Sequence, residues 1–208
     1  MDIGVTYDLR SDYLALGYSE EATAEFDAEE TIAAVCAALG GLGHKVERIG
    51  GVWPLAAALV AGKRWDAVFN ICEGLKGVSR EAQVPALLEA FDVPYMFSDP
   101  LTLALALDKA LAKRVVRDAG VPTADFALIE SESDIAKVML PFPLFLKPVA
   151  EGSGKGVGGR SKVDNQSELE SVAAIWSTCD CACTKVWSRS FRSAAICPEL
   201  IALFATIS

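Results

Sequence analysis

The residues best suited to chemistry are a lysine and the glycine-rich loop that follows it, in "LFLKPVAEGSGKGV" at 144–157. Lys147 ends an apolar run, where an ammonium group is costly unless an anionic partner neutralises it. Glycines let the backbone approach a ligand closely and adopt positive φ angles, so that successive N–H groups can point at one anion. The combination predicts a site for an anionic ligand.

Three phosphate-binding arrangements place glycines in such a pattern. A Walker A loop needs Ser or Thr directly after its lysine, and Gly156 follows Lys155, so that arrangement is excluded. Gly154, Gly156 and Gly159 match G-x-G-x-x-G, but that fingerprint should join the first strand of a βαβ unit to a helix. Residues 156–163 have a strand pattern instead. The sequence therefore favours a β-hairpin flap over a nucleotide triphosphate, with a flexible surface hairpin as the alternative.

The first hundred residues must build the framework for this site. Strand patterns at 3–7, 45–49, 65–72 and 94–98 alternate with helical patterns. One of these helices is expected at 27–41, where Asp27 and Glu30 have the spacing of an N-terminal cap. Such βαβα alternation predicts a parallel sheet covered by helices.

A longer helix is predicted at 98–122, with Asp99 as its cap, Pro100 in its first turn and Gly120 at its end. Beyond it the strand and helix patterns alternate less regularly. We therefore expect a second, smaller α+β unit, with the boundary near residue 100.

Charge and hydropathy exclude two classes of partner. The net charge of −9 argues against nucleic-acid binding, which needs basic surfaces to displace counterions. No apolar run approaches the roughly 18–20 residues of a membrane span, and the charged N-terminus lacks the apolar core of a signal peptide. We expect a cytoplasmic protein.

Several segments together resemble D-alanine–D-alanine ligases and their relatives in the ATP-grasp family. The similar segments are "FNICEG" at 69–74, 79–113, "GVPTADF" at 120–126 and the loop at 144–157. The resemblance covers roughly residues 1–175 in order. It implies an α/β protein: a Rossmann-like parallel-sheet N-terminal domain at 1–100 and an α+β ATP-grasp subdomain at 101–175, without the second ATP-grasp subdomain.

Members of that family use ATP to join a carboxylate to an amine, forming ADP, and act in peptidoglycan synthesis. The resemblance implies ATP and an amino acid, such as D-alanine, as small-molecule ligands, and it leaves a homodimer open as the assembly. It assigns nucleotide contacts to Lys109, to Lys147 at the α- and β-phosphates, and to the flap, where Ser153 faces the phosphates. Lys147 and Ser153 are the catalytic candidates. The flap residues are Glu151, Gly152, Ser153, Gly154, Lys155, Gly156 and Val157. For Lys109, a solvated helix face shared with Lys113 and Arg117 is the alternative.

The substrate site is predicted at Glu73, Ser79 and Arg80. Glu73 stands at the carboxyl end of a predicted parallel strand, where ligands of open α/β sheets bind. It occupies the place of a family histidine. Ser79 and Arg80 are expected to begin the next helix, whose N-terminus could hold a carboxylate. Glu20, Glu21 or Glu25 of the first loop could contact a substrate amine, but we expect each of them to be a solvated charge.

The resemblance stops after residue 175. The family should next supply an acidic segment that clasps adenine and then Mg²⁺ ligands, but the chain at 176–208 contains Cys179, Cys181, Cys183 and Cys197 and no sustained periodic pattern. We expect an atypical, poorly packed tail, for instance from a shifted reading frame, with a soft-metal site as the alternative. No Mg²⁺ ligands are assigned, so we expect no ligase turnover. A non-catalytic nucleotide-binding remnant or interaction module is the second functional hypothesis.

Overall fold

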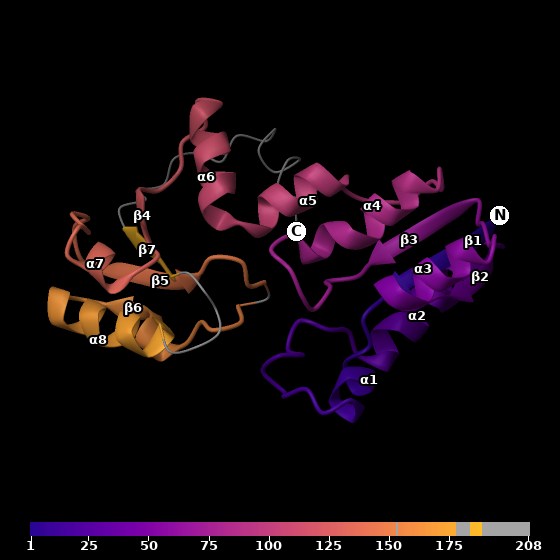
Figure 1. Cartoon of the computed structure of the whole chain (residues 1–208), viewed down its shortest axis with the longest axis horizontal. Helices are drawn as coiled ribbons and strands as arrows, with labels where there is room; N and C mark the ends of the chain where they lie inside the picture. Colours follow the sequence, from indigo (N-terminus) through magenta and orange to yellow (C-terminus); the bar gives the residue numbers. More distant parts are fainter. Residues whose placement is uncertain (153, 178–183, 189–208) are drawn as a thin grey trace. The chain divides into compact units, whose positions relative to one another are not determined.

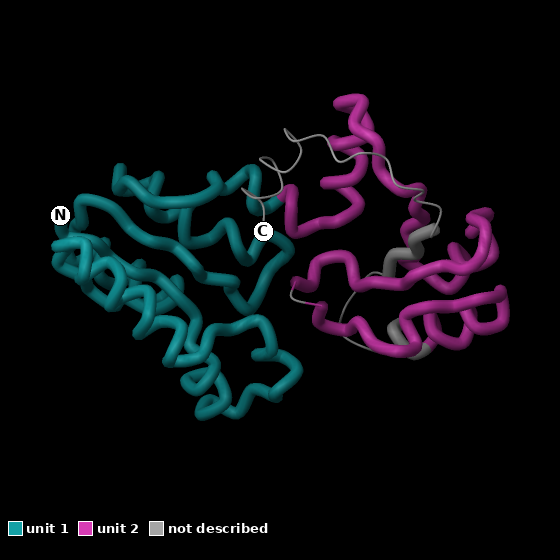
Figure 2. Tube along the Cα trace, turned by 180° about the vertical axis from the view of Figure 1, so that it is seen from behind, with its two compact units in different colours: residues 1–104, 203–208 teal, residues 105–202 magenta. Residues whose placement is uncertain are grey.

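The computed structural model describes residues 1–152, 154–177 and 184–188 of the 208-residue chain. The chain forms two compact units that divide between Ala104 and Leu105 (Figure 2). Each unit is built around its own sheet. Among the described residues, no helix has the length and apolar content that crossing a membrane requires.

The first unit contains a three-stranded sheet in the order β2-β1-β3, and all its strands are parallel (Figure 1). Its elements, in chain order, are β1 (Asp2–Tyr7), α1 (Arg10–Ala15), α2 (Glu29–Gly41), β2 (Lys45–Arg48), α3 (Val52–Val60), β3 (Ala67–Ile71), the 3-10 turn η1 (Arg80–Ala82), α4 (Gln83–Ala90) and the first part of α5 (Pro100–Leu107), whose last three residues belong to the second unit. The predicted parallel sheet is confirmed.

Alternation along the strands places helices on both faces of this sheet. Ala67 of β3 packs with Ile3 and Val5 of β1 against α2, where Leu39 is buried. The next residue of β3, Val68, points to the opposite face and packs against α3 and α4. Side chains two residues apart share a face of a strand, so one strand serves two separate cores.

Three predicted details of the secondary structure before residue 122 are wrong. The cap of α2 is Ala28, not Asp27, and the helix has no side-chain cap. The predicted strand at 94–98 reduces to one bridge between Tyr95 and Val68, because Phe97 has a φ of +79°, which ends the extended conformation. The single helix predicted at 98–122 is two helices.

The break between those helices lies at Asp108. Its backbone is extended, and its carboxylate accepts hydrogen bonds from the amides of Ala110 and Leu111, at 2.7 and 3.0 Å. An aspartate that caps in this way begins a new helix. The predicted cap at Asp99 is confirmed, since its carboxylate accepts from the Thr102 amide at 3.0 Å.

The second unit contains a four-stranded sheet in the order β4-β7-β5-β6, in which every pairing is antiparallel. Its elements, in chain order, are α6 (Lys109–Asp118), β4 (Phe126–Ile129), α7 (Glu132–Ile135), β5 (Leu144–Pro148), the 3-10 turn η2 (Gly159–Ser161), β6 (Lys162–Val163), α8 (Gln166–Ser177) and β7 (Thr184–Ser188). The core of this unit lies between the sheet and α7 and α8, with Leu144, Leu146 and Leu169 fully buried.

The sequence did not predict β7. This strand lies between β4 and β5 and pairs Val186 with both Ala127 and Leu146, so it contributes to the sheet from within the segment expected to be an atypical tail. The four cysteines at 179, 181, 183 and 197 lie outside the described residues, as does the rest of that segment beyond β7.

Candidate functional site

The carboxyl ends of the three parallel strands meet around Asp8. This residue follows β1, and its side chain is buried with a residue exposure of 3%. Its carboxylate accepts hydrogen bonds from the Tyr13 hydroxyl at 2.6 Å and from the Gly74 amide, just beyond β3, at 2.8 Å. In the order β2-β1-β3, the second and third strands lie on opposite sides of β1, so the winding direction of the chain reverses there. Open α/β sheets bind ligands at such a reversal point.

A buried ion cluster lies next to these strand ends. The Arg80 guanidinium is 2.8 Å from the Glu25 carboxylate, and their side chains are only 9% and 3% exposed. Glu81 lies 4.0 Å from the same guanidinium. The expectation that Glu25 is a solvated charge is therefore wrong. Burial forces two opposite charges to pair, because an isolated ion would lose its hydration without compensation.

Glu73 belongs to the same cluster electrostatically. Burial raises its pKa from 4.5 to about 7, and the negative charges of Glu81 and Glu25 contribute, while Arg80 partly opposes them. A carboxyl group that changes charge near neutral pH can hold or release a proton at a substrate amine.

Ser79 and Arg80 do not begin a helix in the predicted manner. They lie at the start of η1, and the α-helix begins only at Gln83. The structure therefore brings Glu73, Arg80 and Glu25 together, whereas the predicted helix N-terminus is replaced by a 3-10 turn. Gly74 makes this close packing possible. A methyl group added there would lie 2.6 Å from the Arg80 carbonyl oxygen, and the backbone φ is +69°.

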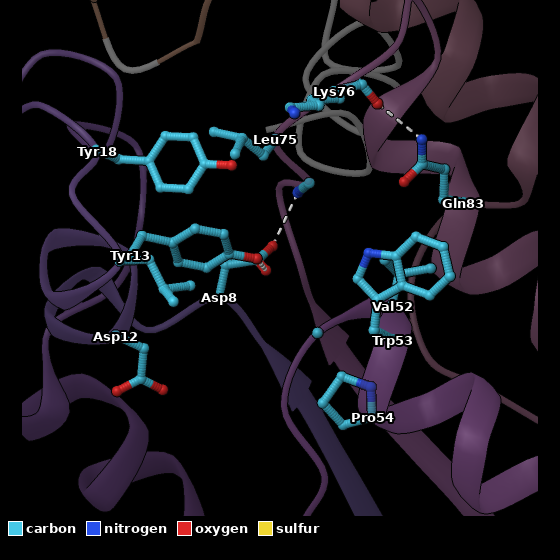
Figure 3. Close-up of a pocket in the computed structure, with 13 residues that line it drawn as sticks. Asp8, Asp12, Tyr13, Tyr18, Val52, Trp53, Pro54, Leu75, Lys76 and Gln83 are labelled. Carbon is cyan, nitrogen blue, oxygen red and sulfur yellow. Dashed lines mark hydrogen bonds between the residues drawn. The ribbon is translucent and has the colours of Figure 1, made fainter.

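A pocket of about 740 Å³ opens beside Asp8, within the first unit. Figure 3 shows the rings of Tyr13 and Tyr18 on one side and Trp53 with Pro54 on the other. Sequence reasoning missed this pocket. The available signal was positional, since Asp8 follows the first predicted strand and Trp53 follows the second, at the edge where their carboxyl ends must meet.

In the second unit, Lys147 lies on β5, where buried and half-buried positions alternate. Leu144 and Leu146 face the core, so Lys147 stands on the opposite face beside Phe145, with its ammonium 5.7 Å from the ring centroid. The sequence predicted a cost for placing the Lys147 ammonium in an apolar run. That cost does not arise, because the side chain lies on the face opposite the core.

The glycine-rich loop connects β5 to β6, and these strands pair antiparallel at Leu144–Val163 and Phe145–Lys162. The predicted hairpin connection is therefore present, but its second strand covers only Lys162–Val163 rather than 156–163, because η2 intervenes.

Two successive turns shape the loop itself. The Lys155 amide donates to the Gly152 carbonyl and the Val157 amide to the Gly154 carbonyl, both at 2.9 Å. Gly156 has a φ of +72°, and a methyl group there would lie 2.7 Å from Pro148 Cγ. The Lys155 ammonium pairs with the Glu151 carboxylate at 2.9 Å. Ser153 lies outside the described residues.

Lys109 holds the start of this loop. Its ammonium donates to the carbonyls of Glu151 and Val149, and its own amide donates to the Val149 carbonyl at 3.2 Å. Lys113, one turn along α6, is buried. Burial and the nearby Arg117 lower the pKa of Lys113 to about 8. The alternative of a fully solvated face is therefore wrong, although Arg117 itself is exposed.

The fold defines a mixed α/β protein whose parallel sheet ends in a ligand-sized pocket and whose second sheet carries a lysine and a glycine-rich loop. No known family profile matches the chain. It is 36% identical over 137 residues to a D-alanine–D-alanine ligase of Xylella fastidiosa, a match that covers 64% of this chain and 45% of the relative. A D-alanine–D-alanine ligase of Sinorhizobium fredii is 41% identical over 126 residues, covering 60% of this chain and 40% of the relative.

A solved structure has a related fold. The D-alanine–D-alanine ligase of Bacillus anthracis, complexed with ATP, superposes with a TM-score of 0.57 at 18% identity, covering 93% of this chain and 60% of that chain. The predicted resemblance to D-alanine–D-alanine ligases is confirmed. The matched segments span less than half the length of the curated relatives.

Proposed function

We propose that this chain carries the nucleotide-binding loop and the amino-acid site of an ATP-dependent carboxylate–amine ligase of the D-alanine–D-alanine ligase type. The observation that carries the proposal is the 36–41% identity to ligases of that name over about 60% of the chain. The two units then correspond to a Rossmann-like domain and an ATP-grasp subdomain. The ATP in the B. anthracis structure supports ATP as the nucleotide.

The proposed reaction has two steps. A carboxylate oxygen of one amino acid attacks the γ-phosphorus of ATP, the bond to the β–γ bridging oxygen breaks, and an acyl phosphate and ADP form. The amine of a second amino acid then attacks the acyl carbon, phosphate leaves with its electron pair, and the amine loses a proton. Catalysis of phosphoryl transfer depends on positioning and on neutralising charge.

The residues are assigned roles by their chemistry. Lys147 and Lys109 supply positive charge beside the loop, and loop amides outside its two turns, such as those of Gly154 and Gly156, supply donors. A bound triphosphate would offer Lys109 an anionic partner in place of the loop carbonyls. Glu73, with its pKa near 7, is suited to take the proton of the amine, and the Arg80 region is suited to the amino-acid carboxylate. Among the described residues, no cluster of three acidic, histidine or cysteine side chains could hold a metal, and we assign no step to one.

Calorimetric titration with ATP tests the nucleotide part. Lys147→Ala is expected to weaken ATP binding about 10- to 100-fold, the usual loss for a charge-assisted hydrogen bond. Lys155→Ala should have a smaller effect, because that ammonium already pairs with Glu151. Lys162→Ala, an exposed lysine paired with Asp164, is the matched control. Equal ATP affinities for the wild type and Lys147→Ala would contradict the assignment.

An ADP-release assay with ATP and D-alanine tests the ligase chemistry. Amino-acid-dependent ADP release would support it. ATP binding without such release would restrict the proposal to nucleotide binding, which is the second hypothesis raised by the sequence.

A further inference from the structure

The pocket in the first unit is large, and its walls come from the carboxyl ends of all three parallel strands. Asp8 follows β1, Gly51 and Trp53 follow β2, and Gly74 follows β3. Its volume of about 740 Å³ lies within the usual range for small-molecule sites and far exceeds what alanine fills. The roles proposed above for Glu73, Ser79 and Arg80 do not use it, since none of the three lines it.

The polar part of the pocket favours a cation. Asp8 and Asp12 contribute carboxylates to the lining, and Lys76 contributes one ammonium. Asp8 is buried and fixed by the Tyr13 hydroxyl and the Gly74 amide, so its carboxylate is held in position. Two hydrogen bonds leave lone pairs on its oxygens for a further donor. An anion here would face this buried negative charge, whereas an ammonium group would be attracted to it.

The apolar part of the pocket is aromatic and open to solvent. Trp53 is 82% exposed and Leu16 is 74% exposed, although both line the pocket. Tyr13 and Tyr18 meet edge to face with ring centroids 5.9 Å apart, opposite Trp53 (Figure 3). Exposed apolar side chains gathered around a cavity mark a binding site. Aromatic faces also attract cations.

We propose that this pocket binds a ligand in which a protonated amine is joined to an aromatic or branched apolar body larger than alanine. The amine pairs with the carboxylate of Asp8, Asp12 adds negative charge to the same lining, and the apolar body packs between the Tyr13–Tyr18 pair and Trp53. If the ligand also carries a carboxylate, Lys76 is the cation that receives it. This site goes beyond the proposed ligase chemistry and needs no nucleotide.

Calorimetric titration without ATP, with phenethylamine as the probe, tests the proposal. We expect phenethylamine to bind at least about tenfold more tightly than 2-phenylethanol, which has the same ring but no charge. Methylammonium, which has the charge but no ring, should bind more weakly than phenethylamine. Binding of 2-phenylethanol as tight as that of phenethylamine would overturn the role of the carboxylates, and absence of phenethylamine binding would overturn the site.

Paired variants locate the binding. Trp53→Ala should weaken phenethylamine binding about threefold to tenfold, and Asp12→Asn should reduce the preference for phenethylamine over 2-phenylethanol. Val60→Ala is the control on the same helix, since Val60 is 78% exposed and does not line the pocket. Glu30→Gln is the control for Asp12→Asn, because it removes one exposed negative charge outside the pocket lining. Trp53 and Asp12 are exposed, so their replacement should leave the fold intact. Unchanged affinity in both pocket variants would overturn the proposal, whether or not the chain binds ATP.

Discussion

The carboxylate of Glu25 lies 2.8 Å from the guanidinium of Arg80, and both side chains are buried although they are 55 residues apart in sequence. The pair connects the loop before α2 to the turn before α4. Glu25→Ala would leave the Arg80 charge buried with weaker compensation, since Glu81 is 4.0 Å away. We expect a loss of about 3 kcal/mol in the free energy of unfolding, measured by urea denaturation.

The exposed pair of Arg48 and Glu29 provides the control. It has better geometry, with two hydrogen bonds of 2.6 and 2.7 Å, but the side chains are 37% and 51% exposed. Glu29→Ala should therefore cost much less than Glu25→Ala, because water already solvates both ions. Equal losses would show that burial does not decide the strength of the Glu25–Arg80 pair.

Glu73 should make stability depend on pH. Its pKa in the folded protein is about 7, against an ordinary value of 4.5, so between these values the folded state holds a proton that the unfolded state has lost. The free energy of unfolding should therefore fall as pH rises through this window. Relative to Glu73→Gln, the wild type should lose about 1–2 kcal/mol between pH 4.5 and pH 8, after allowance for partial exposure.

Urea denaturation of both proteins across that pH range gives the difference directly. A second variant tests the cause. Glu81→Gln removes the neighbouring charge that raises the pKa of Glu73 most. The pH window should therefore shift to lower pH, toward the ordinary carboxyl value. A pH profile identical in wild type and Glu73→Gln would contradict the raised pKa.

The sequence predicts the parallel sheet well because β1 and β3 are largely apolar runs, while β2 alternates charged and apolar residues as a strand does. It predicts less well where one residue overrides a local pattern. Asp108 interrupts an apolar helical stretch by capping the next helix, and Phe97 ends a strand through a positive φ angle. The signal at Asp108 was available, because aspartate is a preferred N-cap. No sequence pattern indicated Phe97.

The candidate sites also contain residues that their position in the sequence indicates and residues that only the folded chain brings together. Glu73 and Arg80 could be found from their place at a strand end and in the resembling segment. The burial of Glu25 could not, because its partner is 55 residues away and only the folded chain joins them. The pocket lining was missed since its residues come from three separate strand ends, and only the tertiary structure shows that they surround one cavity.

Gly74 should tolerate no side chain. At this position a methyl group would meet the Arg80 carbonyl oxygen at 2.6 Å, and the backbone has a φ of +69°. Gly62 has a comparable φ of +85° but no atom within 4 Å of the added methyl group. Gly62→Ala should therefore cost only the conformational penalty, about 1 kcal/mol. Gly74→Ala should cost about 1–3 kcal/mol more because backbone must move.

Thermal or urea denaturation of the two alanine variants separates these effects. The variant at Gly74 should also weaken the hydrogen bond from its amide to Asp8, since the loop must shift. Equal destabilisation of the two variants would mean that the contact with Arg80 is relieved without cost.

Lys109 should control the order of the glycine-rich loop before any nucleotide binds. Its ammonium donates to the carbonyls of Val149 and Glu151, which begin the loop. Lys109→Met keeps the length of the side chain but removes both donated hydrogen bonds. Amides at 149–158 should then exchange with deuterium about tenfold faster, because local opening loses charge-assisted hydrogen bonds.

Hydrogen exchange measured by mass spectrometry on peptides covering 149–158 gives the result without ATP. Lys137→Met is the control in the same unit, since Lys137 is exposed and pairs with Asp134 rather than with the loop. Adding ATP extends the measurement to the proposed function. If the Lys109 ammonium binds phosphate in place of the loop carbonyls, ATP should slow deuterium exchange of the loop amides in the wild type. The slowing should be smaller in Lys109→Met. Unchanged exchange in Lys109→Met without nucleotide would show that other contacts order the loop.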